Sequence, residues 1–178
     1  MLRSGRAFNN SLTTRADTSL PPMQQPPPVD RLLTDLTTFP RDLTRLLSGA
    51  ELDWKLRRQA GEWSLTEVIC HLRDVEREVH QERFEVLIRE DGAFLPGAVA
   101  DAWVTERGYQ AQNGKEALGS FLVAREQTVA LLEGLDESLW QRQGQHAFFG
   151  PTSMHELLYL AVQHDQAHWE QIVNLLDE

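Results

Sequence analysis

The sequence has one cysteine, Cys70, and no apolar run long enough to cross a membrane. A single cysteine cannot form an intrachain disulfide or a cysteine-based zinc cluster, so a reducing compartment is the simplest interpretation. A membrane-spanning helix needs about 18 to 20 apolar residues, and a secretory signal needs an apolar stretch near its start. The sequence shows neither, and we expect a cytoplasmic protein that does not enter a membrane.

Basic residues are also scarce. The chain has 17 lysines and arginines against 27 aspartates and glutamates, which gives a net charge of −10 at pH 7. Nucleic-acid binding needs a basic surface that displaces counterions from phosphates, and no basic cluster compensates here. We therefore expect no nucleic-acid partner.

Residues 1–28 differ in composition from the rest of the chain. They contain five of the eight prolines, three arginines, one acidic residue and few large apolar side chains. Such a segment buries too little apolar surface to offset the entropy lost on ordering it. We predict an extended or disordered tail over residues 1–28, which is a non-globular extension, a transit-like peptide or the result of an early start codon. One folded domain should follow over residues 29–178.

The folded part has helical periodicity, with no sustained alternation typical of a strand. Periodicity and capping signals predict four helices, over residues 29–47, 64–90, 115–133 and from Thr152 or Ser153 to Leu176. Pro40 should bend or restart the first helix because it lacks a backbone donor.

These helices predict an all-α fold, a four-helix bundle. The connection over residues 91–114 is too long for a tight turn, which favours a topology in which it crosses the bundle. Trp103 and Tyr109 in this connection would cover one end of the bundle. The sequence does not decide whether two chains form a homodimer through the bundle faces.

The six histidines fall into two groups. His164 and His168 are four residues apart on the apolar seam of the last helix, and His71 lies within about 60° of the apolar face of its own helix. These three should point inward. His80 is about 180° round the helix from His71, and His155 is related to His164 in the same way, so both should face outward. The sixth, His146, is expected in a loop at the surface or rim.

A buried imidazole is either a core residue with satisfied hydrogen bonds or a ligand. Two inward rings four residues apart leave nitrogens that one divalent cation would satisfy. The segment HDQAHW superficially resembles a zincin motif, but only ten residues follow it and its carboxylate is an aspartate. A di-iron carboxylate bundle needs two Glu-x-x-His motifs, which are absent, and nothing indicates haem.

Four segments carry a family resemblance: GEWSLTEVICHLRDVE at 61–76, FLVARE at 121–126, GPTS at 150–153 and HDQAHWEQI at 164–172. In combination they resemble the DinB-like (DinB/YfiT) superfamily over residues 29–176. The resemblance implies an up-down-down-up bundle and one divalent metal ion, often nickel or zinc, held by His71, His164 and His168. Members of known activity use low-molecular-weight thiols, and many others are labelled hydrolases.

Three neutral imidazoles leave an ion its full charge and an open position, which is the catalytic pattern of coordination. Zinc or nickel is favoured, and iron or copper would also accept these ligands. The leading hypothesis is a thiol-dependent S-transferase acting on small electrophiles, with a low-molecular-weight thiol as co-substrate. The alternatives are a metal-hydroxide hydrolase and a non-catalytic interaction protein stapled by its metal.

Three further side chains are candidates for catalytic roles. Glu78, two turns beyond His71, is an acid/base candidate or an acidic residue at a wet cavity mouth. Asp165 would orient a histidine ring or pair with an arginine. Arg125 would bind a substrate carboxylate or form a structural ion pair. Cys70 is expected to be a small buried residue rather than a ligand or nucleophile.

Overall fold

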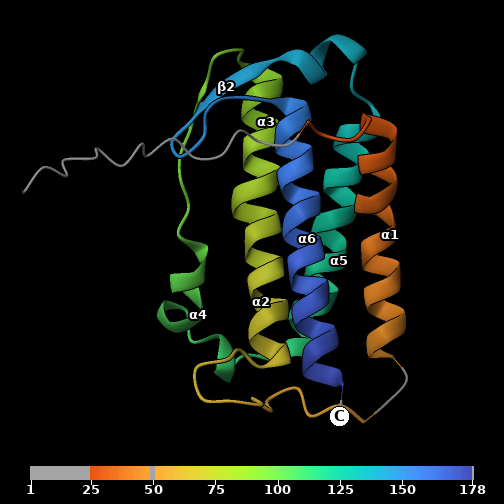
Figure 1. Cartoon of the computed structure of the whole chain (residues 1–178), viewed down its shortest axis with the longest axis vertical. Helices are drawn as coiled ribbons and strands as arrows, with labels where there is room; N and C mark the ends of the chain where they lie inside the picture. The colour runs from red at the N-terminus through yellow and green to blue at the C-terminus, as the bar shows by residue number, and fades with distance from the viewer. Residues whose placement is uncertain (1–24, 49–50, 178) are drawn as a thin grey trace, which may run out of the picture.

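Four long helical segments pack side by side in the computed structural model, which describes residues 25–48 and 51–177 (Figure 1). Most of the predicted tail, residues 1–24, lies outside the described residues. Three of the segments are single helices: α1 (Val29–Leu47), α5 (Gly114–Glu133) and α6 (Met154–Leu176). The fourth is continuous through α2 (Leu65–Val75), the π-helical turn η1 (Glu76–His80) and α3 (Gln81–Arg89). No described helix is long and apolar enough to cross a membrane.

The helices run up-down-down-up. α1 and α6 point one way along the bundle, and α2–α3 and α5 point the other way (Figure 1). Since α2–α3 and α5 are parallel, the chain between them must return along the length of the bundle. This crossover carries η2 (Ala100–Ala102), α4 (Trp103–Glu106) and η3 (Tyr109–Ala111) along the outer side of α2 and α3. Tyr109 at its end is fully buried.

Capping boxes fix the start of the two helices that carry inward histidines. The Ser64 hydroxyl accepts from the backbone N–H of Glu67, whose carboxylate accepts from the Ser64 N–H at 2.8 Å. Ser153, rather than Thr152, caps α6 with Glu156 in the same way. Each cap contributes about 0.5–2 kcal/mol and sets the phase of the helix that follows.

Helix α1 runs through Pro40 without restarting. Proline has no N–H, so the carbonyl of Leu36 loses its usual partner four residues later. That carbonyl accepts instead from Nη1 of Arg125 on α5, at 3.3 Å. A neighbouring helix therefore supplies the missing donor, which explains why the predicted restart does not occur.

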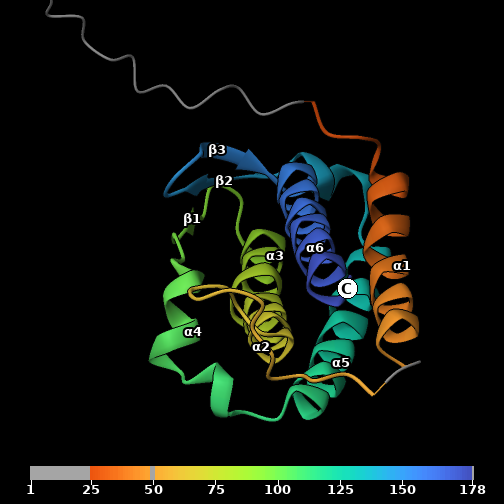
Figure 2. The ribbon, with the colours of Figure 1, turned by 60° about the horizontal axis from the view of Figure 1, so that its bottom comes forward.

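A small sheet lies at one end of the bundle, where no strand was expected (Figure 2). Strand β2 (Gln143–His146) pairs in parallel with β1 (Phe94–Leu95) and antiparallel with β3 (Gly150–Ser153). The strands have two to four residues and no apolar alternation, so only their pairing defines them. β2 pairs with β3 across a short turn, and with β1 across some 50 residues. Close approach requires Gly144, where a Cβ would lie 2.7 Å from the side chain of Leu95.

The apolar core is divided into two clusters. One lies toward the sheet and includes Leu32, Leu36, Phe84, Leu132 and Leu158. The other lies toward the opposite end and includes Phe39, Ile69, Leu72, Phe121 and Ile172. Along three of the four helical segments, all but α1, the boundary between the clusters coincides with buried polar side chains: His71, Glu76, His80, Arg125, Thr128 and Asp165. A polar layer therefore crosses the middle of the bundle.

Candidate metal centre

Three histidine rings converge in this polar layer. His71 comes from α2, and His164 and His168 come from successive turns of α6. Each offers a ring nitrogen, and the three nitrogens lie within 4.8 Å of one another. Nε2 of His71 is 3.1 Å from Nε2 of His164. The rings thus meet as their helical positions and the family resemblance predict, while metal binding stays a prediction.

The spacing of His71 and His164 fits a shared ion. Two nitrogens each about 2.0–2.1 Å from one ion are about 2.9 Å apart at a right angle and about 3.4 Å apart at a tetrahedral angle. The observed 3.1 Å falls between these values. His168 is also oriented for this role, because its Nδ1 lies 2.8 Å from Oε1 of Gln171. The amide oxygen can only accept, so the proton is on Nδ1 and the lone pair of Nε2 is free.

Burial keeps these rings neutral. Loss of water, with a contribution from neighbouring His168, lowers the pKa of His71 to about 4. Burial also lowers the pKa of His164 well below its ordinary value, and that of His168 to a smaller degree. At neutral pH all three rings offer lone pairs. Nδ1 of His71 and of His164 are buried without a partner among the described residues.

His80 is not on the outer face, and that prediction is wrong. It is buried, and its ring centre lies 5.2 Å from that of His164. The cause is the π-helical turn η1, in which hydrogen bonds join residues five apart and each residue turns less than the 100° of an α-helix. Nine residues of uniform α-helix would have placed it opposite His71. Burial lowers the pKa of His80 to about 4, so this ring is neutral as well.

His146 lies outside the histidine trio, as expected, but the prediction that it is in an exposed loop is wrong. It occupies an inward position of β2 and is 4% exposed. Its Nδ1 accepts hydrogen bonds from the backbone N–H groups of Phe148, at 3.1 Å, and Phe149, at 3.4 Å. The prediction failed because the strand that holds this residue was not foreseen. His155 lies apart from the converging rings, with Nε2 2.7 Å from the Pro27 carbonyl oxygen.

Arg125 and Asp165 form a structural ion pair, one of the two alternatives for each. Two guanidinium nitrogens of Arg125 contact the two oxygens of Asp165 at 2.6 and 2.9 Å. Arg125 also donates to Glu76 at 2.8 Å, a residue that sequence reasoning did not single out. Burial raises the pKa of Asp165 to about 6. Burial acts in the same direction on Glu76, but the charge and the hydrogen bond of Arg125, with contributions from His80 and Thr128, together hold the pKa of Glu76 below its ordinary value. We call these three residues the buried cluster.

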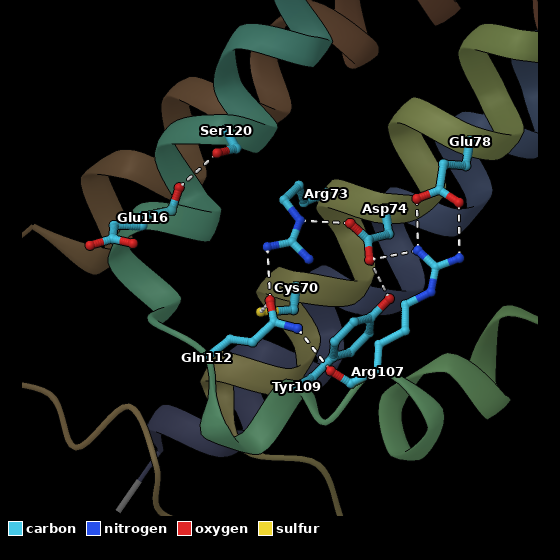
Figure 3. A network of polar contacts seen from close by, with 9 residues as sticks. All are labelled: Cys70, Arg73, Asp74, Glu78, Arg107, Tyr109, Gln112, Glu116 and Ser120. Atoms are coloured by element: carbon cyan, nitrogen blue, oxygen red, sulfur yellow. Dashed lines mark hydrogen bonds and ion pairs between the residues drawn. The ribbon is translucent and has the colours of Figure 1, made fainter.

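Glu78 belongs to a different group of contacts. Both of its carboxylate oxygens accept from Arg107 of the crossover, at 2.7 and 2.9 Å. Arg107 also donates to Asp74 at 2.9 Å, and the Tyr109 hydroxyl donates to Asp74 at 2.6 Å. We call these four residues the crossover network (Figure 3). Nearby, Cys70 is completely buried as expected, and burial raises the pKa of its thiol.

A cavity of about 440 Å³ adjoins the three histidines. Its walls come from the continuous segment α2–η1–α3, from α6, from the crossover near residue 100, and from β2 and the turn that follows it. His71 and His164 line it, and Glu78 does not. Asp101, which also lines the cavity, was missed because its place depends on the path of the crossover; its charge raises the pKa of His71 and His168 against the effect of burial.

The fold and sequence have known relatives. The chain matches the family model of the DinB superfamily over residues 36–172. YfiT from Bacillus subtilis, described as a probable metal-dependent hydrolase with an unusual four-helix bundle topology, is 20% identical with a TM-score of 0.72, over 82% of this chain and 84% of that one. TT2238, described as a four-helix bundle protein, is 22% identical with a TM-score of 0.57, over 82% and 98% of the two chains. No curated protein matches. From the family match, this chain belongs to the DinB superfamily.

Proposed function

We propose that His71, His164 and His168 hold one divalent metal ion and that the protein is a metal-dependent enzyme. The observation that carries this proposal is the convergence of three neutral imidazoles, two of them with Nε2 atoms 3.1 Å apart, beside a cavity of about 440 Å³. When bound, such an ion supplies Lewis acidity that brings the pKa of a ligating water or thiol toward neutrality. Zinc or nickel is the expected ion, and iron or copper would fit the same ligands.

The surrounding residues hold the three rings in place. Gln171 fixes the orientation of His168 through its Nδ1. The Trp63 ring stacks on His168 with ring centres 6.1 Å apart and lies 5.0 Å from the ring of His71. This apolar surface excludes water from one side of the site. The buried cluster ties α6 to α5 and η1 next to His164, which keeps the two ligand-bearing helices in register.

For the reaction we propose hydrolysis of a small molecule in the cavity. The likeness to YfiT, a probable metal-dependent hydrolase, supports this choice over the transferase favoured from sequence. Thiol transfer to a small electrophile is the second candidate, because neutral imidazole ligands serve a thiolate as well as hydroxide and the cavity has an apolar wall. We place the activity in the cytoplasm, in keeping with a lone, buried thiol.

Metal analysis tests the proposal. The purified protein should contain about one divalent ion per chain, and His168→Ala should lose most of it because two ligands hold an ion far less tightly than three. His155→Ala is the matched control, since that ring lies outside the converging trio. Equal metal content in the wild type and His168→Ala would contradict the site.

Activity assays then separate the reactions. The metal-loaded protein should cleave activated esters or amides, and removal of the ion should abolish cleavage. Consumption of a thiol by an added electrophile, without cleavage, would favour transfer instead. A protein that binds its ion, loses thermal stability on chelation and does neither reaction would have a structural metal only.

A further inference from the structure

The cavity beside the histidine trio contains an arginine that the proposed metal site does not use. Arg83 of α3 lines the cavity and is half-buried, and burial lowers the pKa of its guanidinium. It donates to the carbonyl oxygen of Pro96 at 2.8 Å. No carboxylate of residues 25–48 or 51–177 lies within ion-pair distance of it, in contrast to Arg125 and Arg107. A guanidinium that is partly removed from water and has no carboxylate beside it is stabilised by binding an anion. Its lack of a carboxylate is notable in a protein of net charge −10.

His146, a residue of the same cavity wall, carries a buried hydrogen-bond donor. Its Nδ1 accepts two backbone N–H groups, so its proton must be on Nε2. That Nε2–H is buried and has no acceptor among the described residues, and His146 lines the cavity. His80 also lines the cavity, and its Nε2 is buried with no hydrogen-bond partner among the described residues. Buried polar atoms of this kind normally have partners, and a bound ligand would provide one.

The remaining wall includes exposed apolar side chains. Val99, Phe148 and Phe149 line the cavity and are 70%, 53% and 43% exposed. Large apolar side chains gathered at a cavity mouth are typical of a surface that contacts an apolar ligand. Together with the polar groups, they describe a ligand with an acidic end and a hydrophobic body.

The charges in the cavity are arranged along its length. Arg83 acts on His80 and His146, whose pKa values its charge lowers. Asp101 acts on His71 and His168 instead. In the metal-free protein an anion is therefore attracted to the Arg83 end and repelled by the carboxylate of Asp101. The Arg83 guanidinium would hold the acidic group of a ligand at its own end of the cavity.

We propose that the cavity binds a small organic acid, with its carboxylate held by Arg83 and by Nε2–H of His146, its apolar body against Phe148 and Phe149, and its reactive group toward His71 and His164. The inference deepens the proposed function by naming its substrate class. A planar carboxylate suits the fork of the guanidinium, which can donate two parallel hydrogen bonds. A phosphate monoester offers related oxygen acceptors, and the test separates the two.

Calorimetry on the metal-free, full-length protein tests the acid site apart from the metal. The probes are 3-phenylpropanoate, its neutral amide and 2-phenylethyl phosphate. The carboxylate should bind at least about tenfold more tightly than the amide, since a charge-assisted hydrogen bond contributes that much. Arg83→Gln should weaken carboxylate binding by about tenfold or more and leave amide binding unchanged.

Two further variants separate loss of the binding site from misfolding of Arg83→Gln. His146→Asn keeps an acceptor near the Nδ1 position for the turn and removes the distal Nε2–H, since the amide N–H groups of asparagine lie closer to the backbone. It should weaken carboxylate binding several-fold. Arg77→Gln removes an exposed arginine from the same helical segment and should have no effect. Circular dichroism and melting temperature establish that each variant is folded.

Several outcomes would overturn the proposal: no carboxylate binding at millimolar concentration, equal binding of acid and amide, or unchanged carboxylate affinity in folded Arg83→Gln. Tighter binding of the phosphate would overturn the carboxylate assignment. Because these measurements use no metal, they can succeed while metal analysis fails, or fail while it succeeds. The two proposals are therefore distinguishable.

Discussion

The buried cluster and the crossover network both neutralise carboxylates with an arginine, but they differ in how far their side chains are exposed to water. In each, one arginine is shared by two carboxylates and joins the α2–η1 segment to another part of the chain. The side chains of the buried cluster are at most 4% exposed, whereas those of Arg107 and Glu78 are 32% and 49% exposed. A buried charge that loses its partner has no water to replace it, but an exposed charge does. The first arrangement should therefore govern stability, and the second should mainly hold the crossover in place.

The largest expected effect is that of Arg125→Met. This change leaves Glu76 and Asp165 buried without a cation and should lower the free energy of unfolding by about 3–5 kcal/mol. Urea denaturation followed by circular dichroism measures it. A variant as stable as the wild type would show that the polar layer is hydrated or rearranges. The buried cluster would then contribute no more to stability than the crossover network.

The buried side should also dominate the response to acid. The folded pKa of His80 is about 4, below the unfolded value of about 6.5. Protonation therefore favours the unfolded chain, so the stability contributed by this ring is complete above pH 6.5 and is lost as the pH falls toward 4. The loss is about 1.4 kcal/mol per pH unit for each such ring, and His71 contributes in the same direction. Asp165, whose folded pKa is raised to about 6, opposes this slope between pH 6 and 4.

His80→Gln isolates one ring from this sum. In metal-free protein, the fall in unfolding free energy between pH 6.5 and 4 should be less steep for the variant, by one proton's worth of slope. Urea midpoints across that range provide the measurement. Parallel profiles for the variant and the wild type would mean that His80 is not buried as a neutral ring.

Arg107→Met should have the smallest effect, about 1 kcal/mol or less. Since the pair is partly exposed, the difference from the wild type should shrink further at high salt, while the effect of Arg125→Met should not change. Paired denaturation series at low and high ionic strength give this comparison. A large, salt-independent loss for Arg107→Met would mean that the crossover network is as desolvated as the buried cluster.

Much of the bundle follows from local signals. The capping boxes at Ser64 and Ser153 and the apolar periodicity fix where the helices begin and which faces turn inward, and those faces carry His71, His164 and His168 together. The family resemblance adds the order of the helices. These features depend on residues near one another in the chain, which is why sequence reasoning reaches them.

The other side of the cavity depends on distant partners. His146 is buried because β2 pairs with a strand about 50 residues earlier, and nothing in residues 143–146 announces that pairing. Arg125 could be placed on an inward stripe, but its partners could not be chosen without knowing that Glu76 and Asp165 face it. Arg83 went unnoticed because an arginine on a helix is ordinarily exposed, and only the folded crossover shows it half-covered and unpaired.

The wide turn at Glu76–His80 has a consequence for the whole of the segment that follows. The turn acts as one extra residue in the helix, so α3 is rotated about the helix axis relative to the direction that a uniform α-helix would give it. The continuous segment α2–η1–α3 can thereby direct His71 to the trio and both His80 and Arg83 to the adjoining cavity. Phe84 stays in the apolar core. Deleting one residue at this turn would leave a regular α-helix and keep the faces of α3 in nearly the same direction, so the extra residue is what allows both His71 and His80 to face the interior.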